Sequence, residues 1–337
     1  MFKQILFAAL LLIVQGCAIQ ETPLEDANTV PESVHNLIYE KFPDARNLSS
    51  IVIEKNKVYE VTFKLNDDKY SVVANGKGII STARTTGEAI PDSLVNRLNN
   101  TIIKGGTFSD YRIITLIDGY PPHPTVNYRL NGTDFVLTLA GSVFMAPYTK
   151  MILLWNLSDL PDKIVQFIDK RNKPNPAFVN TLVNLNQQTR DSLKVNNELS
   201  FRGAILYVNS DGTKTYEVNV SYFGATSQRL LFTGSGDLIW VSSFNAIRQY
   251  DQDLTKRNFD TNLTLKEMMT FTDILRASSH FFGFSLDVSD NLQNSFRNEY
   301  AGLTSYTLFL SNNSPDRWTL YYDANKKLIF PVYSAGW

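Results

Sequence analysis

The chain has 337 residues, of which 43% are hydrophobic and 12% aromatic, and 32 basic residues against 33 acidic ones leave a formal net charge of −1. Lys and Arg are dispersed along the sequence rather than clustered, so we expect no nucleic-acid partner. The single cysteine excludes an intrachain disulfide, and hydrophobic cores must therefore hold the folded part together.

Residues 1–17 have the pattern of an export signal. Lys3 supplies a positive charge, and residues 5–14 form an apolar core of about ten residues, where a membrane-spanning helix needs roughly 20. The core ends in Val14-Gln15-Gly16-Cys17, which resembles a lipobox. In lipoproteins with this motif the cysteine becomes the first residue and carries acyl chains such as palmitate. We therefore predict lipid attachment at Cys17.

The residue after this cysteine bears on location. Ala18 stands where an aspartate would indicate retention in the inner membrane, so the prediction is an outer-membrane lipoprotein that faces the periplasm or the cell surface. Residues 18–29 are polar and contain Pro23, which is typical of a flexible tether. Membrane contact is therefore expected through the acylated Cys17.

The first folded segment opens with a predicted helix at residues 31–42. Pro31 and Glu32 suit a helix N-terminus, because proline needs no hydrogen-bond donor there and an acid complements the helix dipole. The apolar residues of this segment recur at helical spacing: Val34, Leu37, Ile38 and Phe42. Alternating segments separated by polar turns then predict antiparallel strands at 48–54, 58–65, 69–75 and 79–83.

The same order of elements recurs along the chain. Proline followed by aspartate begins a second predicted helix at 90–98 and a third at 160–168, whereas a fourth, at 265–282, has no proline start. A helical pattern also covers 178–185. Further strands are predicted at 111–117, 125–130, 134–140, 151–157, 199–209, 215–223, 228–233, 238–242, 303–311, 318–323 and 327–332. In one of them Trp318, Leu320 and Tyr322 share a face, which we expect a helix to cover.

These elements predict an α+β fold built of tandem repeats, each with one helix packed on an antiparallel β-sheet in the order helix, strand, strand, strand. The predicted organisation is a signal peptide at 1–17, a tether at 18–29, a tandem pair of α+β units at 30–157 and a second, divergent pair at 158–337.

Several motifs carry a family resemblance. They are Val30-Pro31-Glu32-Ser33-Val34, Lys41-Phe42-Pro43-Asp44-Ala45, Tyr59-Glu60-Val61-Thr62-Phe63, Ile90-Pro91-Asp92-Ser93-Leu94 and Leu160-Pro161-Asp162-Lys163-Ile164-Val165. This set resembles the PepSY-like family of exported and lipid-anchored Bacteroidetes proteins, also described as β-lactamase-inhibitor-like. The resemblance spans residues 30–170 and continues through 199–243 by strand pattern. It implies tandem α+β units and a role in binding or inhibition, and it supplies no catalytic residues.

The sequence holds few candidates for chemistry. Its three histidines, His35, His123 and His280, do not share the spacing of metal ligands, and motifs for zinc, calcium, phosphate or a nucleophilic serine are absent from the sequence. We therefore predict no catalytic residue, no metal and no cofactor. The candidate partner contacts are Tyr120 and His123, in the stiff segment Tyr120-Pro121-Pro122-His123-Pro124, and the aromatic Trp155.

The sequence is compatible with three classes of function. The first is a non-enzymatic envelope lipoprotein that binds a protein or peptide, with inhibition of a secreted or periplasmic enzyme as one form of that binding. The second is a carbohydrate-binding surface lipoprotein, which requires an exposed aromatic platform that residues such as Trp240 and Trp318 would supply. The third is an enzyme, which requires two acids that converge in a cleft.

Overall fold

The computed structural model describes residues 29–87, 89–116, 121–139, 142–171, 200–209, 211–222, 226–242, 260–278, 292, 295–300, 303–311 and 316–336. The predicted signal peptide, Cys17, the tether up to residue 28, Tyr120, His280 and the helical pattern at 178–185 lie outside these residues. The prediction of two tandem pairs that divide at residues 157 and 158 stays a prediction.

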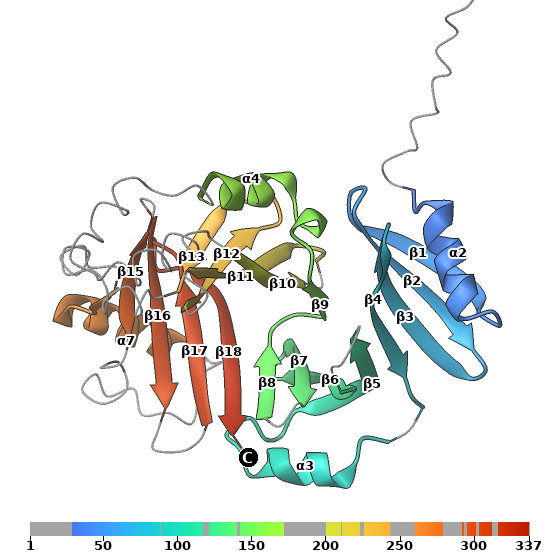
Figure 1. The fold of residues 1–337 in the computed structure, drawn as a ribbon. Coiled ribbons are helices and arrows are strands. Elements are labelled where there is room, and N and C mark those ends of the chain that lie inside the picture. The colour runs from blue at the N-terminus through green and yellow to red at the C-terminus, as the bar shows by residue number, and fades with distance from the viewer. Residues whose placement is uncertain are drawn as a thin grey trace, which may run out of the picture.

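The described strands form two antiparallel sheets, and the larger of them has 13 strands (Figure 1). Its strands, in spatial order, are β1 (Arg46–Glu54), β2 (Val58–Leu65), β3 (Asp68–Asn75), β4 (Gly78–Thr85), β5 (Thr107–Leu116), β6 (His123–Leu130), β7 (Thr133–Leu139), β8 (Ser142–Ala146), β18 (Leu328–Gly336), β17 (Asp316–Tyr322), β16 (Leu303–Ser311), β15 (Phe296–Tyr300) and β14 (Asp260–Asn262). The last strand in the chain, β18, thus lies in the interior of the sheet between β8 and β17.

A second antiparallel sheet has five strands. In spatial order they are β13 (Leu238–Val241), β12 (Thr226–Thr233), β11 (Lys214–Tyr222), β10 (Ser200–Val208) and β9 (Lys150–Leu154). The described helices are α2 (Glu32–Lys41), α3 (Asp92–Asn99), α4 (Asp162–Arg171), α7 (Leu265–Ala277) and the short 3-10 helix η1 (Leu157–Asp159). Figure 1 shows α2 on the outer face of β1–β4 and α4 over the five-stranded sheet.

Four helices begin close to the predicted positions. At α2, α3 and α4 the carbonyl oxygen of the preceding proline accepts an early helical N–H, from Val34, Leu94 and Ile164 respectively. Pro31 is the N-cap of α2 rather than its first helical residue, which corrects its predicted place by one position. The fourth helix, without a proline, begins instead with a capping box in which Thr264 and Glu267 exchange hydrogen bonds.

The predicted fold class, tandem units of one helix on its own sheet, is wrong. The protein is mainly β: β4 pairs with β5, and β8 pairs with β18, so the expected small sheets merge into one. The helices α3 and α7 also share one hydrophobic core, which contains both Leu98 and Phe271. Alternation of apolar residues predicts which face of a strand is buried, but it carries no information about which edge the strand will pair with.

Strand β17 shows how the two sheets are joined. On one face Trp318, Leu320 and Tyr322 lie in the core that α7 covers, with the ring centroids of Phe271 and Tyr322 5.0 Å apart, so this prediction is confirmed. On its other face Tyr321 packs with Trp240 of the five-stranded sheet, at a centroid distance of 4.5 Å. The five-stranded sheet is therefore packed firmly against the large one.

Candidate functional site

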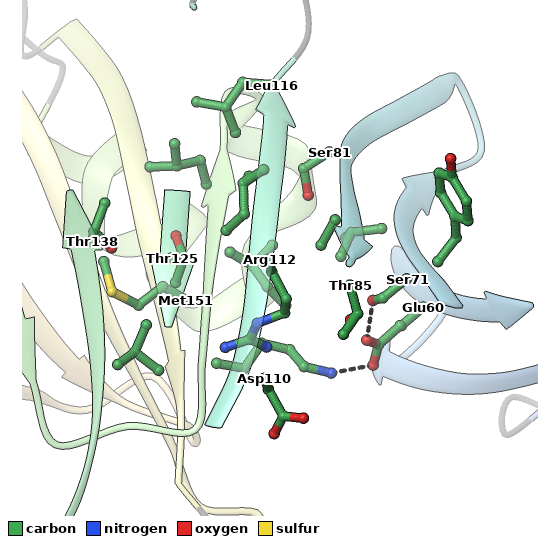
Figure 2. Close-up of a pocket in the computed structure, with 18 of the residues that line it drawn as sticks. Glu60, Ser71, Ser81, Thr85, Asp110, Arg112, Leu116, Thr125, Thr138 and Met151 are labelled. Atoms are coloured by element: carbon green, nitrogen blue, oxygen red, sulfur yellow. Dashed lines mark hydrogen bonds and ion pairs between the residues drawn. The ribbon is translucent and has the colours of Figure 1, made fainter. Parts of the chain in front are cut away.

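A pocket of about 420 Å³ lies where β2–β4, β5–β7 and β9 meet (Figure 2). Its lining residues are Glu60, Thr62, Lys69, Tyr70, Ser71, Val73, Ser81, Ala83, Thr85, Asp110, Arg112, Ile114, Leu116, His123, Thr125, Val136, Thr138, Lys150, Met151, Ile152 and Leu153. A cavity of this size suits a small molecule or part of a peptide.

The strand register explains why these residues meet. Side chains two residues apart share one face of a strand, and registered partners on neighbouring strands lie side by side. Three registered rows cross the pocket-facing side of the sheet: Lys69, Thr85, Arg112, Thr125 and Thr138; Thr62, Ser71, Ala83, Ile114 and His123; and Glu60, Val73, Ser81 and Leu116. One wall of the pocket is thus a continuous sheet surface that spans β2 to β7, and serine and threonine are its commonest polar residues.

Strand β9 supplies the facing wall through residues 150–153. Its Lys150 forms an ion pair with Glu60, and the hydroxyl of Ser71 donates to the other carboxylate oxygen of Glu60 at 2.5 Å. Glu60 is only 4% exposed, so both of its oxygens are bonded where water cannot replace the partners. This pair ties the five-stranded sheet to β2 at the edge of the pocket.

A β-bulge in β5 positions Arg112. The register shifts between Ser109 and Arg112, and Asp110 within the bulge has a φ of +51°, a left-handed conformation that aspartate tolerates better than most residues. The guanidinium Nη2 of Arg112 donates to Asn127 Oδ1 at 2.5 Å, and Asn127 Nδ2 donates to Asp110 Oδ2 at 2.9 Å. The bulge and this chain of hydrogen bonds hold the guanidinium in one orientation.

Two buried polar atoms in the first of the three registered rows have no hydrogen-bond partner among the described residues. They are Nε of Arg112 and Oγ1 of Thr125, which belong to registered partners on β5 and β6. Thr125 is 1% exposed, and burial lowers the pKa of Arg112 more than the nearby carboxylates of Asp110 and Glu60 raise it. Leaving buried donors without a partner lowers the free energy of unfolding.

The unpaired hydroxyl leads to a stability prediction. Replacing Thr125 with the nearly isosteric valine should raise the free energy of unfolding by about 1 kcal/mol, because the buried hydroxyl loses its hydrogen bonds to water on folding. Urea unfolding followed by circular dichroism measures the change. Thr115, an exposed threonine on β5, provides the matched control, and Thr115→Val should change the stability little. A marked loss of stability in Thr125→Val would show that the hydroxyl is bonded.

His123, which lines the pocket, makes the stability of the protein depend on pH. Burial lowers its pKa below the ordinary value of 6.5, against a smaller opposing effect of a hydrogen bond with the backbone of Pro121. The folded state binds the proton more weakly than the unfolded state. The contribution of His123 to the free energy of unfolding is therefore fully present above pH 6.5, and it is lost as the pH falls through the lowered pKa. His123→Gln should remove this component. Unfolding of both proteins between about pH 7.5 and 5 tests this, and parallel pH profiles would contradict it.

The predicted partner contacts fall in different places. His123 lines the pocket, whereas Trp155 follows β9 outside it, 39% exposed, with its ring over Gly203. Tyr120 lies outside the described residues. The candidate sugar-binding aromatics Trp240 and Trp318 are 1% and 2% exposed, so neither forms a surface platform.

Sequence analysis missed four residues that define this site: Glu60, Arg112, Thr125 and Lys150. Glu60 and Thr125 lie on strand faces whose alternate residues are polar, so alternation assigns them to solvent. Arg112 and Lys150 share faces with apolar residues, but a single cation on such a face carries no signal of a site. Within the described residues, no group of three or more His, Cys, Asp or Glu side chains is placed to hold a metal ion.

This protein shows only weak similarity to known proteins. The sequence matches no known family profile and no curated protein. Among solved structures, a DUF2874 family protein of Bacteroides uniformis is 14% identical, with a TM-score of 0.29 over 33% of this chain and 83% of its own. A BLIP-like protein of Bacteroides fragilis is 11% identical, with a TM-score of 0.28 over 33% of this chain and 80% of its own. A Bacteroides eggerthii protein, provisionally described as periplasmic, is 12% identical with a TM-score of 0.29 over 33% of this chain and 82% of its own.

A helix needs about 20 mainly apolar residues to cross a bilayer. In the part of the chain that the structure describes, no helix has both the length and the apolar character needed to cross a membrane.

Proposed function

We propose that this protein is a non-enzymatic binding protein of the cell envelope, in which the pocket between β2–β7 and β9 receives part of a protein or peptide partner. The observation that carries the proposal is the cavity of about 420 Å³ itself, which β2–β7 and β9 line with apolar side chains together with polar and charged ones, as is typical of ligand sites.

The arrangement of the acids favours binding over catalysis. Glu60 bonds Ser71 and Lys150 through separate oxygens, and Asp110 accepts a hydrogen bond from Asn127. Both carboxylates of the pocket are thus already engaged in holding its walls. A general acid or base needs instead to contact the group that reacts.

The proposal includes the membrane anchor. An acylated Cys17 at the outer membrane, followed by the tether at 18–29, would hold the pocket near envelope partners. Metabolic labelling with palmitate tests the anchor: the wild type should carry the label and fractionate with the outer membrane, whereas Cys17→Ala should do neither. Labelling that persists in Cys17→Ala would contradict acylation at this residue.

The binding function is tested with a blocked pocket. Ala83 lies in the middle of the three rows, so Ala83→Trp would fill the cavity, whereas the adjacent Arg84 is exposed and its side chain points to the other face of β4. The full-length acylated protein, Ala83→Trp and the matched control Arg84→Trp serve as baits in solubilised envelope from the native cells. We expect a stoichiometric partner with the wild type and Arg84→Trp, and at least about tenfold less with Ala83→Trp, equivalent to 1.4 kcal/mol.

Equal capture by all three baits would exclude the pocket as the binding site. Where the captured partner is an enzyme, the proposal includes its inhibition, and Ala83→Trp should restore its activity while Arg84→Trp should not. Circular dichroism spectra and thermal unfolding of the three baits establish that each is folded.

A further inference from the structure

The wall that β9 supplies to the pocket is the edge of a strand rather than its face. Among the described strands, β9 ends the five-stranded sheet and pairs with β10 on one side only. A strand that lines a cavity through one face contributes every second residue, whereas residues 150–153 of β9 all line the pocket. The free edge of β9 therefore borders the cavity. Such an edge carries backbone N–H and C=O groups with which a further strand can pair.

The register with β10 shows which backbone groups lie on this edge. The carbonyl oxygen of Val208 on β10 accepts hydrogen bonds from the backbone N–H and the hydroxyl of Thr149, at 3.0 and 2.9 Å, so Val208 directs its backbone groups toward β9. Val208 is registered with Lys150, and every second residue of an antiparallel strand bonds the same neighbour. Lys150 therefore pairs with β10, whereas Met151 and Leu153 direct their N–H and C=O groups to the edge that borders the pocket.

The exposure of β9 agrees with this assignment. Ile152 and Leu154 alternate with the outward residues and are 1% and 0% exposed, whereas Met151 and Leu153 are partly exposed. No backbone hydrogen bond joins Met151 or Leu153 to another described residue outside the ladder with β10. Strand β4 lies close to β9 without pairing with it. The outer backbone groups of both residues are thus left for a ligand.

The sheet wall of the pocket suits the far edge of an added strand. Half of the backbone groups of an extended peptide that pairs with β9 would point away from β9. Ser81, Thr85 and Thr138 line the cavity and are partly exposed, and a hydroxyl bonds either an N–H or a C=O group because it both donates and accepts. Figure 2 shows Thr138 on the same side of the view as Met151, with Ser81 and Thr85 on the other. An extended peptide would therefore find hydrogen-bond partners on both of its edges.

We propose that the pocket binds an extended segment of the peptide partner, which adds as a short strand to the free edge of β9 and pairs with the backbone of Met151 and Leu153. The hydroxyls of the sheet wall bond its other edge. This inference rests on the proposed function and specifies the form of the ligand. The recognised group is a main chain in β conformation, so binding tolerates different side chains.

The first test measures whether main-chain donors carry the binding. The probe is an uncharged, acetylated and amidated pentapeptide of alternating threonine and valine, residues that favour strands, and the full-length protein is in detergent. Alternate N–H groups of an extended peptide lie on opposite edges, so N-methyl groups on two adjacent central residues remove one donor from each edge. Isothermal titration calorimetry should show at least about tenfold weaker binding of the N-methylated probe. The matched control replaces both valines with isoleucine, which adds as many carbons but keeps every donor, and it should bind like the parent.

Amide hydrogen exchange, read by NMR, locates the added strand. In the free protein the N–H groups of Met151 and Leu153 should exchange faster than those of Lys150 and Ile152, which are bonded to β10. A saturating amount of the pentapeptide should slow exchange at Met151 and Leu153 at least about tenfold. It should leave the rates in β1 and β14, the ends of the large sheet, unchanged.

Variants assign this protection to the pocket. Ala83→Trp fills the cavity and should abolish both the protection and the binding of the pentapeptide. Arg84→Trp adds the same ring on the opposite face of β4 and should preserve both. Because the two variants carry equal bulk, a difference between them reflects occupation of the cavity.

Several results would overturn strand addition at β9. They are outer amides already as protected in the free protein as those of β10, equal affinity for the N-methylated and parent probes, binding that leaves Met151 and Leu153 unprotected, and no binding of the parent probe. Any of these, together with partner capture that Ala83→Trp abolishes, would leave the proposed function standing. Partner capture that Ala83→Trp does not reduce would instead count against the proposed function itself.

Discussion

Replacing Trp240 with alanine should lower the free energy of unfolding by about 3–5 kcal/mol, the range for truncating a large buried aromatic. Trp240 is 1% exposed, and its ring meets that of Tyr321 edge-on at 4.5 Å. Its indole N–H donates to the Tyr306 carbonyl at 3.3 Å and to Thr307 Oγ1 at 3.2 Å. The substitution therefore leaves a cavity between the two sheets and removes two of the hydrogen-bond contacts between them.

Chemical unfolding followed by tryptophan fluorescence and circular dichroism measures this loss. Trp155→Ala is the matched control, since this tryptophan is 39% exposed and should cost about 1 kcal/mol or less. Trp240→Phe should fall between the two, because it keeps most of the apolar area but loses the donor. A cost for Trp240→Ala no larger than that for Trp155→Ala would contradict the packing between the sheets.

Replacing Lys150 with alanine should lower the free energy of unfolding by roughly 2 kcal/mol, below the 3–5 kcal/mol expected when a fully buried pair is broken, because Lys150 itself is 31% exposed. The cost arises at Glu60, which is 4% exposed and would keep only the hydrogen bond from Ser71. Because the pair joins β9 to β2, the variant should also loosen the pocket wall.

Two further variants test whether the unpaired carboxylate of Glu60 causes the loss of stability in Lys150→Ala. Arg129→Ala removes a cation from an exposed ion pair with Asp134 on β6 and β7, and should cost less than about 1 kcal/mol. Glu60→Gln combined with Lys150→Met removes both charges and should recover much of the stability lost in Lys150→Ala. If the double variant is no more stable than Lys150→Ala, the loss does not come from the unpaired carboxylate of Glu60.

The fold could be predicted locally and not globally. The helix starts at Pro31, Pro91 and Pro161 were predictable, because a proline followed by an acid and then by helical spacing is a local signal. The burial of Trp318, Leu320 and Tyr322 was predictable from alternation. The pairing of β4 with β5 and of β8 with β18 was not, because strand edges carry hydrogen-bonding groups that are the same for every sequence.

Less of the candidate site than of the fold could be predicted from the sequence. His123 drew attention through the prolines around it and does line the pocket. Glu60 gave no such signal: it alternates with Tyr59 and Val61, which pack under α2, so its own face reads as exposed. Its burial results from β9, which lies 90 residues further along the chain at Lys150. Such a contact is a property of tertiary structure, and a short stretch of sequence does not contain it.

The interior place of β18 in the sheet has a consequence for how the chain folds. Residues 333–336 of β18 pair with residues 142–145 of β8, so the large sheet is complete only when residues about 190 positions apart have come together. Until then both β8 and β17 present open edges to other chains. A product truncated before β18 would keep those two edges exposed, so it would aggregate through strands in the middle of the sheet rather than through the strands at its ends.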